Sequence, residues 1–187
     1  MKRLFPVLLL LLFSSCATVK PPLSTPEFVN LDRFMGEWFV IATIPWAVEK
    51  NNVATRDIYR PLGGDRIEVT YAFRKGSLDA PEQEWKAKAW VVNKTTNAEW
   101  KVQFFWPLSL PYIITDLDPD YEWVVIGHPS RDYLWIMSRN PTLPRETLGE
   151  IIQRVEAQAF DPARIQTVPQ LPGQEAQPVL DLLKTKP

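Results

Sequence analysis

The 187-residue sequence has one cysteine, Cys16, and one histidine, His128, and this scarcity excludes two kinds of site. A single cysteine cannot form an intrachain disulfide, so the fold must rest on its apolar core. Metal sites built from His and Cys need several such ligands, so we expect neither a metal nor a cofactor. Lys and Arg number 21 against 22 Asp and Glu, which leaves no basic excess for nucleic acid.

The apolar run at the start of the chain is too short to cross a membrane. Leu4–Phe13 has ten residues, whereas a spanning helix needs about 20. Lys2 and Arg3 precede the run, and Ser14-Ser15 follow it. This layout is typical of a cleaved secretory signal, which we assign to residues 1–15.

Cys16 directly follows these small residues and resembles the cysteine of the bacterial lipobox, with Phe13 in place of the usual Leu. The resemblance implies a diacylglycerol on the Cys16 sulfur, cleavage just before it, and an acyl chain such as palmitate on the new amine. Two or three chains make a stable anchor, at about 0.8 kcal/mol per buried CH₂. Ala17, rather than the Asp that retains lipoproteins in the inner membrane, implies the outer membrane, on either face. The alternative is a soluble periplasmic protein with a free cysteine, a liability in an oxidising compartment.

The rest of the chain divides into a tether, one domain and a tail. Residues 16–30 are Pro-rich without periodic pattern, which predicts an extended tether. Residues 31–172 form the domain, and residues 173–187 are a C-terminal tail. Within the domain, eight runs rich in β-branched and aromatic residues alternate with turn signals: Glu37–Ile44, Ala54–Tyr59, Arg66–Phe73, Glu84–Val92, Trp100–Phe105, Tyr112–Leu117, Tyr121–Gly127 and Tyr133–Ser138.

These runs predict an all-β fold, an eight-stranded antiparallel up-and-down barrel with one helix packed outside. Eight strands close a barrel just wide enough for one small ligand. Apolar residues then take helical spacing from Leu148 to Ala159, between Pro144 and the stop signal Asp161-Pro162. Arg164–Val168 is a candidate ninth strand, and residues 179–183 are either a small docked helix or disordered.

Three short motifs carry a resemblance to a known family. Gly36 and Trp38 match a Gly-x-Trp motif, Asp120 and Tyr121 match part of a Thr-Asp-Tyr motif, and Arg139 follows the eighth strand. In this order, before one helix, they resemble the lipocalins, and Arg131–Arg139 resembles the bacterial outer-membrane lipoprotein and apolipoprotein-D-like branch. The resemblance implies that Trp38 closes one barrel end beneath the Arg139 guanidinium, a cation–π contact worth about 0.5–2 kcal/mol.

Strand alternation predicts which side chains face the barrel interior. The alternation does not decide which residues of the second strand face inward, because Arg56 could point either into the barrel mouth or outward. An apolar wall with a few tyrosines at the rim suits an acyl chain, and the resemblance implies a fatty acid or lysophospholipid. A filled barrel without ligand remains the alternative, since any small barrel needs an apolar core. The predicted lining is Val40, Ala42, Ile67, Val69, Tyr71, Ala87, Ala89, Val102, Phe104, Tyr112, Ile114, Val125, Trp135 and Met137.

Two apolar loops flank the predicted open end, Ile44–Val48 and Trp106–Pro111. They fit three roles equally: insertion into a bilayer, contact with a partner or a second copy in a homodimer, or a lid over the barrel. His128, Ser130 and Asp132 lie on one turn, but closeness in sequence is not the geometry of a catalytic triad. We therefore expect a binding protein rather than an enzyme.

Overall fold

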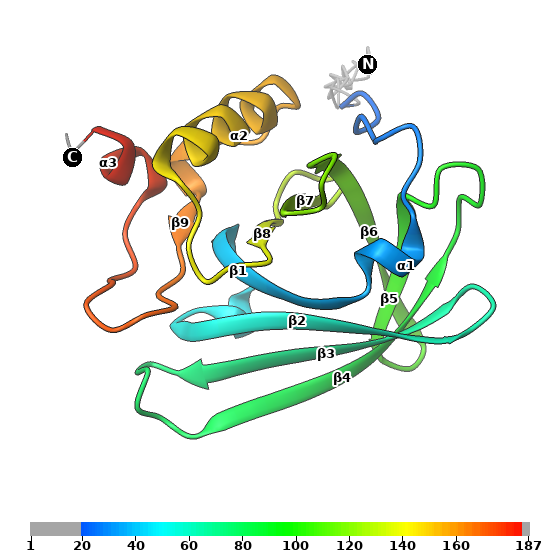
Figure 1. The fold of residues 1–187 in the computed structure, drawn as a ribbon, viewed down its shortest axis with the longest axis horizontal. Helices are drawn as coiled ribbons and strands as arrows, with labels where there is room; N and C mark the ends of the chain where they lie inside the picture. The colour runs from blue at the N-terminus through cyan, green and yellow to red at the C-terminus, as the bar shows by residue number, and fades with distance from the viewer. Residues whose placement is uncertain (1–19, 185–187) are drawn as a thin grey trace, which may run out of the picture.

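The computed structural model describes residues 20–184 (Figure 1). The expected signal, residues 1–15, and Cys16 lie outside this range. The helices are α1 (Leu31–Phe34), α2 (Arg145–Ala157) and α3 (Val179–Lys184), with 3-10 turns η1 (Ala47–Glu49) and η2 (Pro162–Arg164). The strands are β1 (Gly36–Ile44), β2 (Asn52–Gly63), β3 (Arg66–Lys75), β4 (Glu82–Val91), β5 (Glu99–Phe105), β6 (Leu108–Leu117), β7 (Trp123–Gly127), β8 (Leu134–Ser138) and β9 (Gln166–Thr167).

Strands β1 to β8 form a closed barrel, which confirms the predicted fold. Each strand pairs antiparallel with the next, and β1 pairs with both β8 and β2. The short β9 adds outside this ring, with Thr167 opposite Ala42 of β1. Because the strands alternate in direction, the β1–β2, β3–β4, β5–β6 and β7–β8 connections share one end. We call this end the open end, and the end with α1 and the β2–β3 turn the closed end.

Two apolar clusters form on the two faces of the barrel wall. One fills the interior, and the other lies between the wall and α2. The helix buries the apolar positions that its period predicts, Leu148, Ile151, Ile152 and Val155. Its Arg154 binds Asp116 at 2.7 Å and lies over the Trp123 ring at 5.1 Å, so the helix is also attached at its polar edge. Figure 1 shows α2 lying across the β7–β8 side.

Arg139 and Trp38 join the closed end to α1. The Arg139 guanidinium carbon lies 3.7 Å from the Trp38 ring centre, and Trp38 Nε1 donates to the Phe34 carbonyl at 2.8 Å. Arg139 also donates at 2.7–3.1 Å to the carbonyls of Arg33, Phe34, Met35 and Glu37. Gly36 has φ +97°, and a Cβ there would lie 3.4 Å from Arg139 Nη1. The Gly-x-Trp motif therefore allows the chain to turn tightly beneath the arginine.

Tyr121 adds a second attachment for α1. Its hydroxyl accepts the Asn30 backbone N–H at 2.8 Å, and the Arg33 guanidinium lies 4.1 Å above its ring. The Asp120 N–H donates to Asp118 Oδ2 at 3.0 Å, which shapes the β6–β7 turn. The two matched residues of the Thr-Asp-Tyr motif therefore lie in a turn that braces the closed end.

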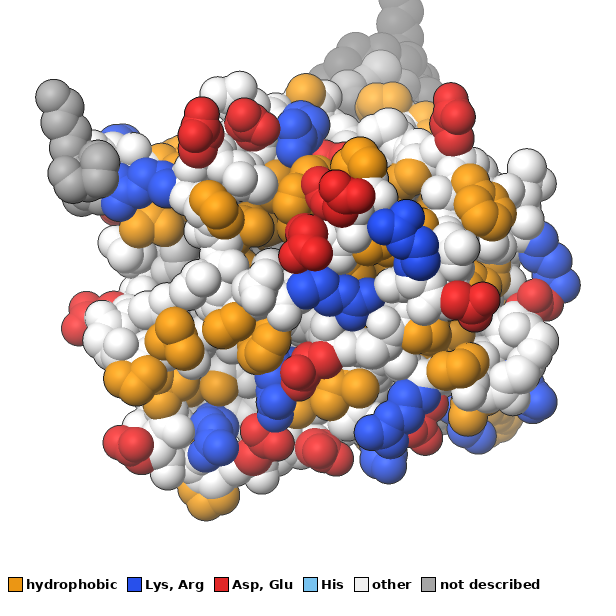
Figure 2. Space-filling view, in the orientation of Figure 1, with side chains coloured by type: hydrophobic (Ala, Val, Ile, Leu, Met, Phe, Trp, Pro, Cys, Tyr) orange, Lys and Arg blue, Asp and Glu red, His pale blue; other side chains and the backbone are white. Residues whose placement is uncertain are grey.

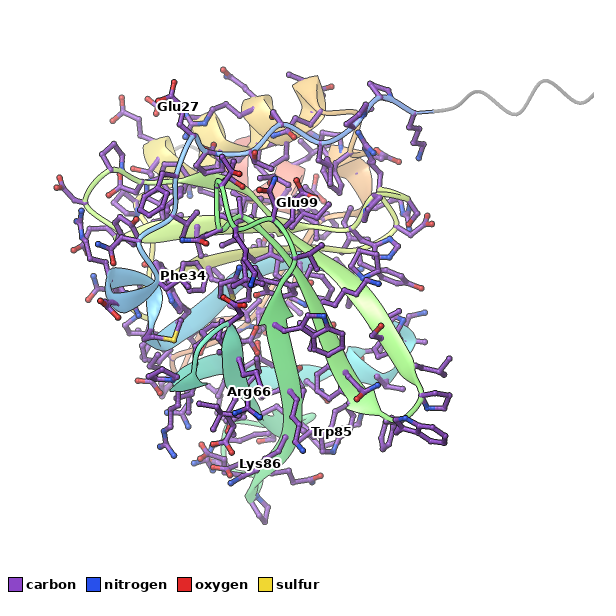
Figure 3. All side chains as sticks on the ribbon, turned by 90° about the vertical axis from the view of Figure 1, so that its right-hand side faces the viewer. Glu27, Phe34, Arg66, Trp85, Lys86 and Glu99 are labelled. Carbon is purple, nitrogen blue, oxygen red and sulfur yellow. The ribbon has the colours of Figure 1, made fainter. Side chains whose placement is uncertain are left out.

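Aromatic rings fill the half of the barrel nearer the closed end. Phe34 of α1 lies within 5.1–5.3 Å, centroid to centroid, of Trp38, Tyr59 and Trp100. Figure 3 views the barrel from the side that carries α1 and labels Phe34 there, with Trp85 and Lys86 on β4. The Tyr112 ring stacks on the Trp100 ring with 5.8 Å between centroids and extends this group of rings toward the open end. The closed end is therefore a packed core rather than a pocket.

The described part of the expected tether is held against the barrel. Lys20 Nζ donates to the Ser130 carbonyl at 2.7 Å, and Arg131 donates to the Pro21 carbonyl at 2.5 Å. Further along, the Val29 N–H donates to the Thr96 carbonyl at 2.7 Å. Residues 20–30 thus run from the β7–β8 connection at the open end to α1 at the closed end. We call this segment the strap.

The C-terminal tail also docks on the domain. Val179, the first residue of α3, is fully buried, and its N–H donates to the Ile165 carbonyl at 2.9 Å. Of the two alternatives for residues 179–183, the structure shows the docked helix. No helix within residues 20–184 is long and apolar enough to cross a membrane. On the face shown in Figure 2, acidic and basic side chains are interspersed.

Replacing Arg139 with Ala should lower the free energy of unfolding by about 3 kcal/mol. The change removes a cation–π contact and several charged hydrogen bonds to carbonyls. Arg66→Ala, which removes an exposed arginine of β3, serves as the matched control. Urea unfolding followed by Trp fluorescence measures both variants. Equal stability of the two would show that Arg139 does not hold the closed end.

Candidate functional site

The barrel interior retains a hollow of about 60 Å³ at its open end. Six of the predicted lining residues border it: Val69, Tyr71, Val102, Phe104, Tyr112 and Trp135. A smaller hollow of about 20 Å³ adjoins it and adds Val40. Five others, Ile67, Ala87, Ala89, Ile114 and Met137, face inward but pack in the interior cluster away from both hollows.

Two predicted lining residues, Ala42 and Val125, face the other way. Both belong to the cluster beneath α2. A bulge between Val40 and Ala42 shifts the register of β1, so the alternation that holds up to Val40 fails at Ala42. In β7 every residue is buried, because one face meets the interior and the other meets α2. In such a strand, apolar residues do not reveal which side faces the barrel interior. The structure shows that Val124 and Ile126 face inward.

Polar residues on the wall were missed by a prediction based on apolar positions. Asp57 lies opposite Trp38 on β1 and Tyr71 on β3, so its side chain points inward with theirs. The alternation of β2 carried a signal for this, because an outward Arg56 implies that its neighbour Asp57 points inward. In the structure Arg56 does point outward, where it binds Glu37 at 2.7 Å and Glu82 at 2.6 Å. The missed polar residues that border the two hollows are Thr43, Glu49, Asn52, Thr55, Asp57 and His128.

Asp57 and Tyr112 form the polar floor of the hollow, and the Tyr59 hydroxyl joins them from behind. The Tyr59 hydroxyl lies 3.0 Å from Asp57 Oδ2 and donates to it, and the same hydroxyl is in close hydrogen-bond contact with the Tyr112 hydroxyl. Burial raises the pKa of Asp57 to about 7, and the Tyr59 hydrogen bond only partly opposes that rise. Burial also raises the pKa of both tyrosines well above the ordinary value. The floor therefore holds one carboxyl that titrates near neutral pH.

Glu49 and Trp46 belong to the connection that covers the hollow. Glu49 Oε2 accepts the Trp46 N–H at 3.1 Å and Trp135 Nε1 at 3.2 Å. The Trp46 ring meets Tyr133 edge to face at 6.1 Å. Burial raises the pKa of Glu49 to about 7, hydrogen bonds from Trp46 and Trp135 oppose this, and Asp57 adds to it. Of the predicted Ile44–Val48 loop, Trp46 takes the lid role over the hollow, whereas Ile44 ends β1 and packs in the cluster beneath α2. We call Trp46–Glu49 the lid.

The second apolar loop projects instead of folding over the barrel. Phe105, Trp106 and Leu108 at the β5–β6 tip are 78%, 86% and 73% exposed. Leu110 and Pro111, nearer the barrel, do border the hollow. We call Phe105, Trp106 and Leu108 the apolar tip. Its exposure leaves open the bilayer and partner roles and removes that of a lid.

His128 and Ser130 bond to each other within the β7–β8 turn. Their Nδ1 and Oγ atoms are 2.9 Å apart, and the Ser130 and Asp132 N–H groups donate to these same two atoms at 3.2 Å. The Asp132 carboxylate binds Arg164 at 3.3 Å. Burial lowers the pKa of His128, so its neutral form persists to lower pH than in an exposed histidine. This arrangement stabilises the turn that forms one wall of the site.

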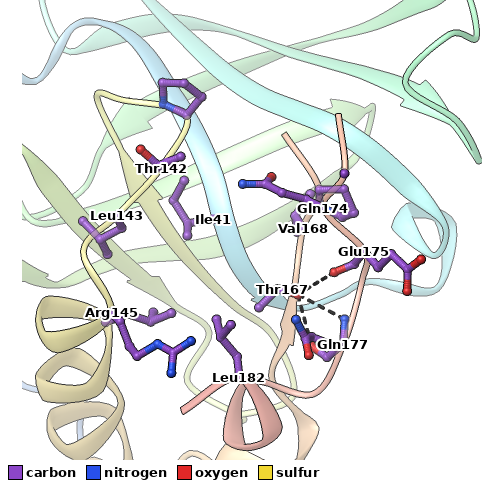
Figure 4. Close-up of a pocket in the computed structure, with 14 residues that line it drawn as sticks. Ile41, Thr142, Leu143, Arg145, Thr167, Val168, Gln174, Glu175, Gln177 and Leu182 are labelled. Atoms are coloured by element: carbon purple, nitrogen blue, oxygen red, sulfur yellow. Dashed lines mark hydrogen bonds between the residues drawn. The ribbon is translucent and has the colours of Figure 1, made fainter. Parts of the chain in front are cut away.

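A larger groove of about 470 Å³ lies outside the barrel, between β1, the start of α2 and the C-terminal segment (Figure 4). Ile41, Leu143 and Val168 line it, and Thr167 Oγ1 donates to nearby carbonyls of the tail. Its charged members, Arg145 and Glu175, are at least partly exposed. Among residues 20–184 no group of acidic, His or Cys side chains is arranged to hold a metal.

A closed barrel with one end sealed and a lidded hollow at the other defines a cup-shaped binding fold. A model of the lipocalin-like domain family matches residues 29–170. The temperature-induced lipocalin-1 of Arabidopsis thaliana is 31% identical over 165 residues, 82% of this chain and 86% of that protein. The outer membrane lipoprotein Blc of Escherichia coli K12 is 30% identical over 172 residues, 85% of this chain and 90% of that protein. The solved structure of insecticyanin from Manduca sexta matches with a TM-score of 0.63 at 16% identity, over 79% of this chain and 84% of that one.

The chain therefore belongs to the lipocalin family, in the branch of the bacterial outer-membrane lipoproteins. This confirms the resemblance carried by Gly36, Trp38, Asp120, Tyr121 and Arg139. Similarity to the outer-membrane lipoproteins also places the chain at the outer membrane.

Stability should fall as pH rises from about 4 to 7, and Asp57→Asn should remove part of this fall. The folded chain keeps the Asp57 proton up to about pH 7, whereas the unfolded carboxyl loses it near pH 4. Folding therefore loses up to about 1.4 kcal/mol per pH unit in that window. Denaturant unfolding across the window, with the exposed Glu84→Gln as control, tests this. An unchanged slope in the Asn variant would contradict a buried, protonated Asp57.

Proposed function

We propose that this chain is a membrane-anchored lipocalin that binds a fatty acid, a lysophospholipid or a similar small hydrophobic ligand, for lipid transport, storage or envelope maintenance. The observation that carries the proposal is the hollow at the open end. Its wall is mainly aromatic and apolar around a few polar groups, which is the usual make-up of a small-molecule site. Membership in the lipocalin family supports it.

Binding of an acyl chain requires the lid to move. Small-molecule pockets usually measure about 300–1,000 Å³, whereas the covered hollow measures about 60 Å³. The lid contacts the barrel wall through the Trp46–Tyr133 ring pair and the Glu49–Trp135 hydrogen bond, both of which must break for it to open. Displacing Trp46 would extend the hollow outward past Phe104 and Leu110, toward the apolar tip.

We propose that the anchor is a lipid on Cys16, as in the lipobox that it resembles. Lys20, held at the β7–β8 connection, is the fourth residue after Cys16. Four extended residues span at most about 14 Å. A lipid on Cys16 would therefore stay close to the open end, which supports an orientation in which the cup faces the bilayer.

A second candidate function is docking through the apolar tip, with the barrel acting as a filled core. The exposure of Phe105, Trp106 and Leu108 favours it, because large apolar side chains grouped on a surface mark interaction sites. The partner would be the bilayer, another protein or a second copy in a homodimer. The small volume of the covered hollow is consistent with this alternative.

Palmitate and lysophosphatidylcholine should quench the Trp fluorescence of the Cys16→Ser chain saturably, because Trp46 and Trp135 border the hollow. Phe104→Asp and Tyr71→Asp should each weaken binding at least about tenfold, because they place a charge on the wall. Val92→Asp is the matched control, since this apolar residue is exposed and follows β4 at the end of the barrel away from the hollow. Near-UV circular dichroism confirms that each variant is folded. No saturable quenching would refute the proposal, and equal affinity of the wall variants would place the site elsewhere.

Cys16→Ser should move the chain from the membrane fraction to the soluble fraction, because the acyl chains that hold it are lost. Fractionation of cells followed by immunoblotting measures this. Should the Cys16→Ser chain stay with the membranes, adding Trp106→Ser distinguishes the two functions. Release only after this second change would support docking through the apolar tip, and would contradict a lipid on Cys16 as the main attachment.

A further inference from the structure

The two hollows meet at a polar shelf near the open end. Glu49, Tyr71 and Trp135 border both of them. Asn52 and Thr55 of β2 border the smaller one, and Asp57 borders the larger one. The shelf thus places two carboxyls, an amide and hydroxyls at the base of an aromatic cup.

The Thr55 hydroxyl is a buried polar group of this shelf that lacks a hydrogen-bond partner within residues 20–184. The residue is only 3% exposed, and its Oγ1 has no hydrogen-bond partner among the described residues. A buried hydroxyl without a partner costs about 1–3 kcal/mol. It borders the smaller hollow together with Glu49, so a group that enters this space would meet a free hydroxyl beside a carboxyl.

The two carboxyls also lack a positive partner. Within residues 20–184, neither Glu49 nor Asp57 takes part in an ion pair. The lysine bonded to the shelf, Lys75, donates to Asn52 Oδ1 and to the Lys50 carbonyl, both at 3.2 Å. Asp57 Oδ2 receives the Tyr59 hydroxyl, and Glu49 Oε2 receives two N–H groups. The other oxygen of each carboxyl accepts none of these bonds.

We propose that the ligand of this barrel is a hydrophobic amine, whose ammonium group binds between the carboxylates of Glu49 and Asp57. The Thr55 hydroxyl accepts a further N–H, and the apolar body lies along Phe104 and Leu110. This inference rests on the proposed function, because it names the chemical class of the ligand in the same cup. Within that class of small hydrophobic ligands, it predicts stronger binding of an amine than of a fatty acid.

The chemistry of the shelf distinguishes an amine from other head groups. Ionised carboxylates only accept hydrogen bonds, and an ammonium only donates them. Such charge-assisted bonds are roughly twice as strong as neutral ones. The rings of Tyr71, Tyr112 and Trp135 around the hollow add faces that attract a cation. A carboxylate head would instead meet two groups of its own charge.

Proton release should accompany binding. Burial raises the pKa of both carboxyls to about 7, so an ammonium must displace their protons below that pH. The other titratable groups on the hollow are Tyr71, Tyr112 and His128, with Tyr59 behind Asp57 and Lys75 beside Asn52. The tyrosines stay neutral because burial raises their pKa, and burial lowers that of His128. Amine affinity should therefore rise as pH increases from 6 to 8.

Three ligands with one chain length test the proposal: dodecylamine, dodecan-1-ol and dodecanoate. Calorimetric titration of the Cys16→Ser chain at pH 8 should give an affinity for the amine at least about tenfold above that for the alcohol, with dodecanoate the weakest. Glu49→Gln and Asp57→Asn should each weaken amine binding by at least about fivefold, and each should reduce the preference for the amine over the alcohol. Glu84→Gln, which removes an exposed carboxyl of β4, should change nothing.

Each other outcome is decisive. Equal binding of the three ligands, or preference for dodecanoate, would overturn the amine proposal and leave the cup function standing. Absence of saturable binding by any of them would overturn both. A preference for the amine that survives both Glu49→Gln and Asp57→Asn, with folding verified by circular dichroism, would place the ammonium elsewhere and overturn the assignment. Should Asp57→Asn fail to fold, Glu49→Gln on the lid still decides the question.

Discussion

The Arg139 guanidinium is the group on which the shape of this barrel depends. It lies on the Trp38 ring and donates hydrogen bonds to the carbonyls of Arg33, Phe34, Met35 and Glu37, at the end of α1 and the start of β1. A planar cation with five donors can satisfy carbonyls at the end of a short helix that would otherwise face the barrel rim. Because these contacts seal one end, every approach to the interior must use the other. The lid, the hollow and the apolar tip are all found there.

The barrel interior has a packed half at the closed end and a partly hollow half at the open end. Phe34, Tyr59 and Trp100 fill the closed half with edge-to-face contacts, which stabilise the fold. Above them the packing loosens where Asp57 enters the wall. A carboxyl of this kind stabilises nothing by itself, because desolvation opposes its charged form. Its presence at the base of a hollow is easier to explain by binding than by stability.

Most of the architecture could be predicted from the sequence, because eight alternating runs and a change to helical period carry strong signals. The helix faces, Trp38 and Arg139 lie where the motifs indicated. The failures have local causes. Ala42 follows a bulge, and Val125 lies in a strand buried on both faces, so neither position obeys a simple alternation.

The polar shelf was missed for a different reason. A search for lining residues by apolar character excludes Asp57 and Glu49 at the outset, since charged groups are expensive to bury. The register across β1, β2 and β3 was needed to turn Asp57 inward. Glu49 lies in a connection whose path over the barrel no strand pattern describes. The parts of the site that differ most from an ordinary core were therefore the least predictable.

The strap has a mechanical consequence. A flexible linker would let the domain turn freely and sample all of the space within its reach. Here Lys20 and Pro21 are fixed to the β7–β8 turn, and Val29 to the β4–β5 loop, so a force applied before Lys20 is passed directly to the barrel wall. With a lipid on Cys16, the barrel and its anchor would diffuse as one body. The exchange of ligand would then be a search in the plane of the membrane rather than in three dimensions.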